Sequence, residues 1–390
     1  MDEHQQGPSL PRGHDREADP RRLVTGNTLF FPVAAAYAIF VLPASVLAML
    51  GLTSIFPALA SGSGHAHEML FGFALAVVAG NQLGPIAMPH LVVLVGLWAV
   101  ARATFVSAPE SMMAATANVA FAALLAAHIA PRLFRAGKKL RNQALPLVVT
   151  AICASSIVFQ LAPRAGFTSA RHTILTVAIL LFAVLMLFMG GRLIAPAVAG
   201  QFYRQGGNLD ARVQPRIESG LLLAMAAAIA ASAFASRPPF DTLAGAATAV
   251  AGALAAVRLL RWRFWALRGR PDLICLATGY AWLALGLLLF GAALATGRYL
   301  SAALHVITVG SLGTLTLNVM VMTWALKARQ DPSRDWVPVW TTILLGAAAL
   351  ARALASLGAD HPLALLGFAS VSWCGAFAFL LIRLLRVKVK

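Results

Sequence analysis

The sequence is poor in charge, and the charge that it has is one-sided. Only 12% of the 390 residues are charged, and 14 Asp and Glu stand against 31 Lys and Arg. Soluble domains carry about 25% charged residues, whereas 59% of this chain is hydrophobic, so the composition excludes a water-soluble globular fold. The basic residues lie in short gaps between apolar runs, as in polytopic membrane proteins. No nucleic-acid partner is therefore expected.

Cysteine is also scarce. The three cysteines, Cys153, Cys275 and Cys374, each lie inside an apolar run, and the sequence contains no C-x-x-C motif. A disulfide framework and a thiolate metal site are therefore not expected. We interpret all three cysteines as packing residues.

Long apolar runs are abundant. A membrane-spanning helix needs about 20 mostly apolar residues. The segments that meet this requirement are residues 28–50, 66–85, 88–107, 111–131, 144–162, 173–196, 217–235, 240–260, 272–296, 300–326, 338–358 and 361–385. We predict an all-α integral membrane protein with about 12 transmembrane helices in one polytopic domain, residues 28–390. The polar tail before it, residues 1–27, is expected to be disordered.

The distribution of Lys and Arg predicts the orientation in the membrane. The gaps between successive predicted spans lie alternately on the two sides of the membrane. The side that holds both termini has 24 of these residues, if those at segment ends are counted with the adjacent gap. The other side has 4, and the interiors of the segments have 3. Cytoplasmic loops are enriched in Lys and Arg. Both termini are therefore predicted to be cytoplasmic, with an even number of spans.

Two further patterns concern packing. Segments 217–235 and 240–260 are rich in Ala, and small residues at i and i+4 let helix backbones approach closely. We interpret these segments as scaffold. The tryptophans that flank inner-side gaps predict an aromatic belt at the membrane surface, and they are Trp262, Trp265, Trp336 and Trp340.

Polar side chains near the spans are candidates for function, because polar groups in lipid are costly. The densest group is GHAHEMLFGF, residues 64–73, at the predicted outer end of its span. If this stretch is a turn, His65 and His67 can converge on one ion. If it is helical, His65 shares a face with Glu68 while His67 points about 160° away, so that the histidines serve different partners. The competing interpretation is two interfacial histidines at a helix start, with Glu68 stabilised by the helix dipole.

His305 is the second candidate. It lies a few residues inside segment 300–326, whose start is predicted at the same outer face as His65 and His67. Three imidazoles on two helices can hold haem iron or copper, with Glu68 orienting a ligand ring through its other nitrogen. This hypothesis requires the two helices to be neighbours. The alternative is a structural histidine bonded to an adjacent helix.

Three arginines lie inside the predicted spans, and they are Arg102, Arg192 and Arg352. Each either extends its guanidinium to the membrane surface or contacts an anion within the protein. For Arg192, in MGGRLIAP at the predicted cytoplasmic side, that anion would be a haem propionate or a similar group. No catalytic residue is predicted.

The segment GHAHEMLFGFALAVVAG, residues 64–80, resembles the NnrS family of polytopic bacterial membrane proteins. The segments MGGRLIAP, GYAWLALGLLL and ALHVITVGSLGTLTLNVM are similar to further family segments in the same order. The resemblance implies about twelve spans in the bacterial cytoplasmic membrane and a cofactor set of haem, copper or both. It also implies a role in denitrification and nitrosative stress, with nitric oxide or an iron-nitrosyl species as partner. The cofactor-binding positions that it carries over are His65, His67, His305, Glu68 and Arg192, with the histidines as metal ligands.

The chain departs from the family pattern at several positions. Ala277 stands where the family often has His, two residues before Gly-Tyr-Ala-Trp. Met322 and Lys327 stand where an Arg and a Gly-His-Thr-Gly-Arg segment usually follow, and Asn81 and Gln82 replace part of an apolar run. We therefore expect one cofactor rather than two.

Two other functions fit parts of the sequence. Twelve spans with both ends inside are also typical of secondary transporters of small solutes, but no segment has a clear mid-span Asp or Glu for ion coupling. A nitric oxide or oxygen reductase core would need copper-binding histidines in segments 173–196 and 217–235, which contain none. We favour the haem or copper protein and leave open whether it turns over a substrate.

Overall fold

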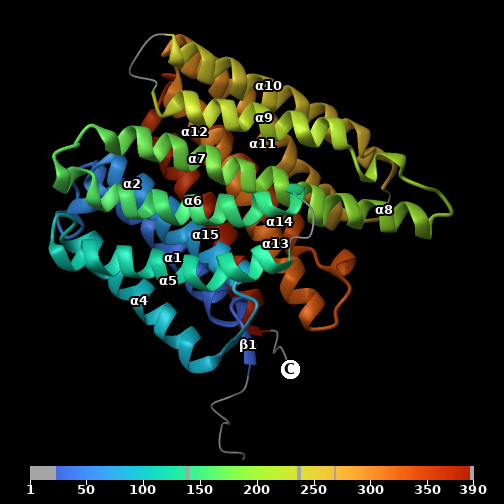
Figure 1. Cartoon of the computed structure of the whole chain (residues 1–390), viewed down its shortest axis with the longest axis horizontal. Coiled ribbons are helices and arrows are strands. Elements are labelled where there is room, and N and C mark those ends of the chain that lie inside the picture. The colour runs from blue at the N-terminus through green and yellow to red at the C-terminus, as the bar shows by residue number, and fades with distance from the viewer. Residues whose placement is uncertain (1–22, 137–139, 235–238, 268, 387–390) are drawn as a thin grey trace, which may run out of the picture.

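The computed structural model describes residues 23–136, 140–234, 239–267 and 269–386, and most of these residues are helical (Figure 1). The longer helices are α1 (Asn27–Met49), α4 (Met88–Ser107), α5 (Met112–Ala136), α6 (Leu140–Leu161), α7 (Ala170–Met189), α9 (Pro215–Ser232), α10 (Phe240–Arg261), α11 (Pro271–Thr296), α13 (Thr314–Lys327), α14 (Val337–Ser356) and α15 (Pro362–Arg386). The shorter ones are α2 (Gly62–His67), α3 (Leu75–Gln82), α8 (Ala195–Arg204) and α12 (Leu300–His305). The prediction of an all-α membrane protein is confirmed.

Within the described ranges, ten helical stretches are long and apolar enough to cross a membrane. The other two predicted spans are helical but more polar. One is the continuous stretch from α2 to α3, which begins with His65, His67 and Glu68 and ends with Asn81 and Gln82. The other is α9, which begins with charged residues. The twelve predicted segments therefore all form helices, and the orientation of the termini stays a prediction.

The predicted tail ends earlier than expected. Residues 1–22 lie outside the described residues, whereas Leu23–Thr25 form strand β1, which pairs antiparallel with β2 (Pro85–Ala87). The Lys327 ammonium at the end of α13 donates hydrogen bonds to the side chains of Thr25 and Asn27. These bonds hold the start of α1 against the end of α13, so residues 23–25 of the predicted tail are ordered.

The longest predicted gap, residues 197–216, is largely helical. Helix α7 continues through a π-helical turn, η4 (Gly190–Ile194), into α8 (Ala195–Arg204), and the 3₁₀ turn η5 (Asp210–Arg212) follows. Pro196 lies two residues after this π-helical turn, and because it has no N–H to donate, one backbone carbonyl of the preceding turn lacks its helical hydrogen bond. The sequence GQFYR, residues 200–204, is polar enough to lie outside the membrane but contains no residue that ends a helix. Helix α8 therefore continues to Arg204, beyond the start of the gap predicted from polarity.

Three helices contain π-helical segments, in which hydrogen bonds skip one extra residue. They are η2 (Glu68–Ala74), η4 and η7 (Val306–Gly313). The first begins directly after His67, the second contains the Gly-Gly-Arg motif, and the third begins directly after His305. Such segments occur frequently at functional sites, and here they coincide with the motifs that the sequence singles out.

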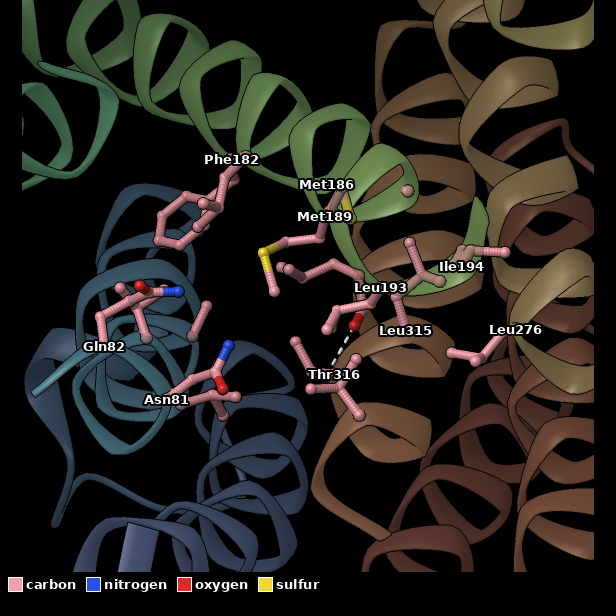
Figure 2. Close-up of a pocket in the computed structure, with 17 residues that line it drawn as sticks. Asn81, Gln82, Phe182, Met186, Met189, Leu193, Ile194, Leu276, Leu315 and Thr316 are labelled. Atoms are coloured by element: carbon pink, nitrogen blue, oxygen red, sulfur yellow. Dashed lines mark hydrogen bonds between the residues drawn. The ribbon is translucent and has the colours of Figure 1, made fainter. Parts of the chain in front are cut away.

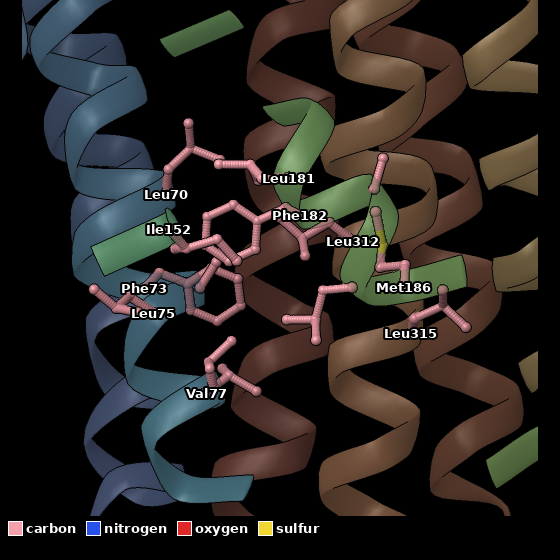
Figure 3. Packing of buried hydrophobic residues seen from close by; sticks show 14 of the residues in the cluster. Leu70, Phe73, Leu75, Val77, Ile152, Leu181, Phe182, Met186, Leu312 and Leu315 are labelled. Carbon is pink, nitrogen blue, oxygen red and sulfur yellow. The ribbon is translucent and has the colours of Figure 1, made fainter. Parts of the chain in front are cut away.

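The core lies where these π-helical segments meet α7. Phe73 and Leu70 of η2 face Phe182 and Leu181 of α7, and Leu312 of η7 closes the other side (Figure 3). All of these side chains are buried. The apolar layer holds the early and late helices of the chain together, and it separates the two ends of the bundle, where polar groups gather.

Glycine allows one pair of helices to pack especially closely. A Cβ atom on Gly252 of α10 would lie 2.7 Å from the backbone nitrogen of Leu288 on α11, and one on Gly291 would lie 2.6 Å from the backbone nitrogen of Ala249. The close packing expected of segment 240–260 is therefore confirmed. The aromatic belt stays a prediction for Trp265, Trp336 and Trp340, which are exposed, whereas Trp262 is fully buried.

Candidate cofactor site and buried polar network

Glu68 is the centre of a buried polar network between α1, α2, η2 and α4. Its side chain is 0% exposed, and Oε1 accepts hydrogen bonds from Arg102 Nη1 at 2.7 Å and from His67 Nδ1 at 2.8 Å. The Tyr37 hydroxyl donates to Oε2. A buried carboxylate is stable only when it is paired and hydrogen-bonded, and Arg102 supplies the opposite charge while the other two groups supply donors.

Neighbouring helices extend this network. Arg102 Nη2 also donates to Asn118 on α5, and His67 Nε2 lies 2.9 Å from Gln160 Nε2 on α6. The His67 ring stacks on Phe105 at a centroid distance of 3.9 Å and is 0% exposed. Both of its ring nitrogens therefore already have partners inside a packed core.

His65 and His305 form a second polar group. Helix α2 begins at Gly62, so His65 and His67 are both helical and point to different partners, as the helical alternative predicts. His65 and His305 lie within electrostatic range of each other, and the Arg352 guanidinium of α14 lies within range of both. The sequence hypothesis that the two helices lie close together agrees with this arrangement.

The hydrogen bonds of this pair fit metal ligation. Nδ1 of His65 is buried and has no hydrogen-bond partner among the described residues. Nδ1 of His305 lies 2.6 Å from the Ser301 carbonyl oxygen, which leaves Nε2 of that ring available. A metal-bound histidine usually donates its other N–H to a carbonyl or carboxylate. Two imidazoles suit haem iron or copper, so His65 and His305 fit the implied cofactor better than His67 does.

The pair has limits as a metal site. Among the described residues, no three His, Cys, Asp or Glu side chains come together as a metal cluster. The Arg352 guanidinium donates to Ser356 and, at 3.3 Å, to the Ser301 hydroxyl, and its positive charge favours an anionic group nearby. A cofactor that carries carboxylates, such as haem, suits this combination of imidazoles and guanidinium.

Arg192 lies far from these histidines. Arg171, at the start of α7, is within electrostatic range of His67, and Arg192 follows 21 residues later along the same helical stretch. At 1.5 Å per residue this separation is about 30 Å. The guanidinium of Arg192 lies over the Phe188 ring at 5.2 Å and lines a cavity between α7, η4 and α9. The structure therefore does not bring Arg192 to the histidines.

A central cavity of about 70 Å³ lies between α3, α7, η4 and η7. Figure 2 shows Asn81 and Gln82 on one side of it, Met186 and Met189 above it, and Thr316 opposite. Most of its lining is apolar, and the two amides are its most polar groups. The sequence change at Asn81 and Gln82 therefore lies at the junction between the early and late helices.

Comparison with known families identifies the chain's relatives. The model of the family described as NnrS protein matches residues 24–389, nearly the whole chain. The chain belongs to the NnrS family. No curated protein matches it. With its many apolar helices, this NnrS-family chain is a multi-pass membrane protein.

The departures from the NnrS pattern have identifiable places in the structure. Ala277 is buried on α11, so a packed methyl group occupies a position where the family often has an imidazole. Lys327 binds Thr25 and Asn27, and its role in this NnrS-family chain is to hold the start of α1. The expectation of one cofactor rather than two stays a prediction.

Sequence reasoning missed most of the partners in the Glu68 network. For Arg102 the sequence allowed two alternatives, contact with the membrane surface or with an anion within the protein. In the structure Arg102 contacts such an anion, the carboxylate of Glu68. The sequence did contain one signal for this pair. Glu68 and Arg102 carry opposite charges near the predicted outer ends of two consecutive spans, 66–85 and 88–107. Tyr37, Asn118 and Gln160 gave no comparable signal, because single polar residues in apolar helices are common.

Proposed function

We propose that this NnrS-family protein binds haem, copper or both at the outer face of the bacterial cytoplasmic membrane and acts in the response to nitric oxide or nitrosative stress during denitrification. The observation that supports this proposal most is the pair formed by His65 and His305. The two rings come from helices far apart in the sequence, and one of them has a buried nitrogen without a partner among the described residues.

Each residue of the proposed site has a separate task. His65 and His305 are the ligands, and the Ser301 carbonyl fixes the orientation of the His305 ring so that Nε2 faces away from its own helix. Arg352 is the cation available to pair with a carboxylate of the cofactor. Copper held by both histidines, or haem held by one of them, would supply a coordination position for a small nitrogen oxide.

His67 and Glu68 support the site in this proposal. Ligation by His67 would require Nε2 to exchange Gln160 for the metal, so we rank it as the third ligand. Glu68 holds the His67 ring through Nδ1, and it therefore acts on the cofactor indirectly. Arg192 is the carried-over position that the geometry supports least.

The test is the cofactor content of the full-length protein purified from cells supplied with haem and copper. We expect one cofactor per chain, measured by the visible absorption spectrum and by metal analysis. His65→Ala and His305→Ala should abolish it, whereas Glu68→Gln should weaken it by about 10–100-fold in affinity, as for other residues that orient a ligand. His172→Ala is the matched control, because His172 is an exposed histidine near the same predicted outer face.

A wild-type protein with a featureless visible spectrum and no stoichiometric copper would overturn the proposal. Transport of a small solute would then be the leading function. Equal cofactor loss in His172→Ala and His65→Ala would also count against it, because an exposed histidine outside the pair would matter as much as a proposed ligand.

A further inference from the structure

A second cavity, of about 210 Å³, lies between α7, η4, η5, α9 and α10, at the end of the molecule toward α8 (Figure 1). Its charged lining residues are Arg192, Arg212, Arg258 and Glu218. Its apolar lining residues include Val184, Leu187, Phe188, Leu221, Leu222 and Met225. The cavity therefore has a strongly polar end and an apolar wall.

Arg258 is fixed at the base of this cavity. Its side chain is 5% exposed, Nη2 donates to Glu218 at 2.9 Å, and Nη1 donates to the Leu187 carbonyl at 2.9 Å. Nε is buried and has no partner among the described residues. A Cβ atom on Gly191 would collide with Nη2, so the Gly-Gly-Arg motif makes room for this guanidinium.

The lining carries an excess of positive charge. Three arginines face one carboxylate, so the lining keeps a net positive charge whichever arginines Glu218 pairs with. Arg192 and Arg212 lie on different segments, one on η4 and one on η5, so they approach the cavity from two sides. Guanidinium groups bind phosphate oxygens well because their N–H donors match the geometry of these oxygens.

The size and the wall of the cavity restrict the ligand. A cavity of about 150 Å³ lined by apolar groups admits benzene, so about 210 Å³ holds a phosphate with a small polar group attached but not a whole lipid. Leu223, next to the lining residue Leu222 on α9, is 73% exposed. An acyl chain can therefore continue along this apolar surface outside the cavity.

We propose that this cavity binds the phosphate headgroup of an anionic membrane phospholipid, with the phosphate between Arg192 and Arg212 and an acyl chain along α9. The predicted orientation places this end at the cytoplasmic surface, where anionic lipids bind basic pockets between helices. Free inorganic phosphate shares the headgroup chemistry, and the experiment separates the two sources.

The experiment measures lipid retention by native mass spectrometry of the full-length protein in detergent. Phosphatidylglycerol and phosphatidylcholine are added separately, and inorganic phosphate is added as competitor. We expect one retained phosphatidylglycerol with at least about tenfold preference over phosphatidylcholine, because each phosphate contact to a guanidinium is charge-assisted. The double variant R192Q/R212Q should lose this preference, and R192K/R212K should keep part of it.

The matched control is R216Q/R261Q, which removes two exposed arginines of α9 and α10 that do not line the cavity. This control should retain phosphatidylglycerol like the wild type. Displacement of the lipid by millimolar phosphate, with the same dependence on Arg192 and Arg212, would assign the site to a soluble phosphate and overturn the lipid proposal. Equal retention of both lipids, or equal loss in the control, would also overturn it. A normal size-exclusion profile of R192Q/R212Q separates lost binding from lost folding.

Discussion

The ion pair between Glu68 and Arg102 should dominate the stability of the outer half of the bundle. The two side chains are 0% and 4% exposed and 2.7 Å apart. Breaking one side of such a buried pair costs about 3–5 kcal/mol, because the remaining charge stays buried without compensation. We expect this cost for Glu68→Gln, since the Arg102 guanidinium cannot lose its proton and neither the neutral amide of Gln nor Asn118 balances its charge.

Arg102→Met should cost less, and its cost should depend on pH. Glu68 keeps Tyr37 and His67 as donors, and it can also take up a proton. Protonating a carboxyl group of ordinary acidity at pH 7 costs about 3.7 kcal/mol, because pH 7 is about 2.7 units above the reference glutamate pKa and each unit is worth about 1.36 kcal/mol. This value is therefore an upper bound for the variant. The bound falls to about 1.6 kcal/mol at pH 5.5 by the same arithmetic, so Arg102→Met should approach the wild type as the pH is lowered.

The assay is the free energy of unfolding by SDS titration of full-length protein in mixed micelles, at pH 7 and at pH 5.5. The double variant Glu68→Gln with Arg102→Met removes both charges, and it should be more stable than Glu68→Gln alone. Additive costs of the two single changes would refute the pairing argument. A cost of Arg102→Met that does not fall on acidification would refute the proposed protonation of Glu68.

Two further changes test the packing of the helices. Gly252→Leu should destabilise the protein by about 1–3 kcal/mol in the same titration, because its side chain must displace the α11 backbone near Leu288. The control is Gly346→Leu, at a glycine with open space around it. A neutral effect of Gly252→Leu would show that α10 and α11 can separate freely. Trp98→Phe should cost about 1–3 kcal/mol, because Nε1 of Trp98 donates to the Gly72 carbonyl inside η2 at 2.9 Å and the buried carbonyl would lose its partner. Unchanged stability in Trp98→Phe would mean that η2 finds another donor.

Much of the fold follows from the sequence because its cause is local. Apolar runs of about 20 residues define helices that cross a membrane, and all twelve predicted segments are helical. The predicted helix ends were less accurate where polar residues continue a helix beyond the apolar run. Residues 197–204 are polar enough for a gap, yet α8 continues through them because no residue there breaks a helix.

The site was less predictable because its causes are not local. The sequence could place His65, His67 and His305 at one face of the membrane, but the π-helical turns that follow His67 and His305 have no sequence signature that we used. Trp262 shows the same limit. Its position beside a basic gap predicted a surface aromatic, but Arg258 lies over its ring at 5.2 Å and Tyr280 packs against it, so it is buried.

The two histidines of the HAHE motif end up in different environments, and helical geometry explains why. Residues two apart on a helix point to nearly opposite sides. His67 therefore enters the space between α4 and α6, where Phe105, Gln160 and Glu68 occupy its ring and both nitrogens. His65 lies within electrostatic range of His305 instead and retains a buried nitrogen without a partner among the described residues.

This division suggests how one short motif serves both stability and binding. Both carboxylate oxygens of Glu68 and both ring nitrogens of His67 have partners within the chain, so they can hold α2 in place without any ligand. Rigid support keeps a ligand ring oriented, and that orientation contributes to metal affinity. We expect His67→Ala to lower the unfolding free energy and to weaken cofactor affinity about as much as Glu68→Gln, by about 10–100-fold, whereas His65→Ala should abolish cofactor binding with a smaller loss of stability. Cofactor loss in His67→Ala with unchanged stability would instead make His67 a direct ligand.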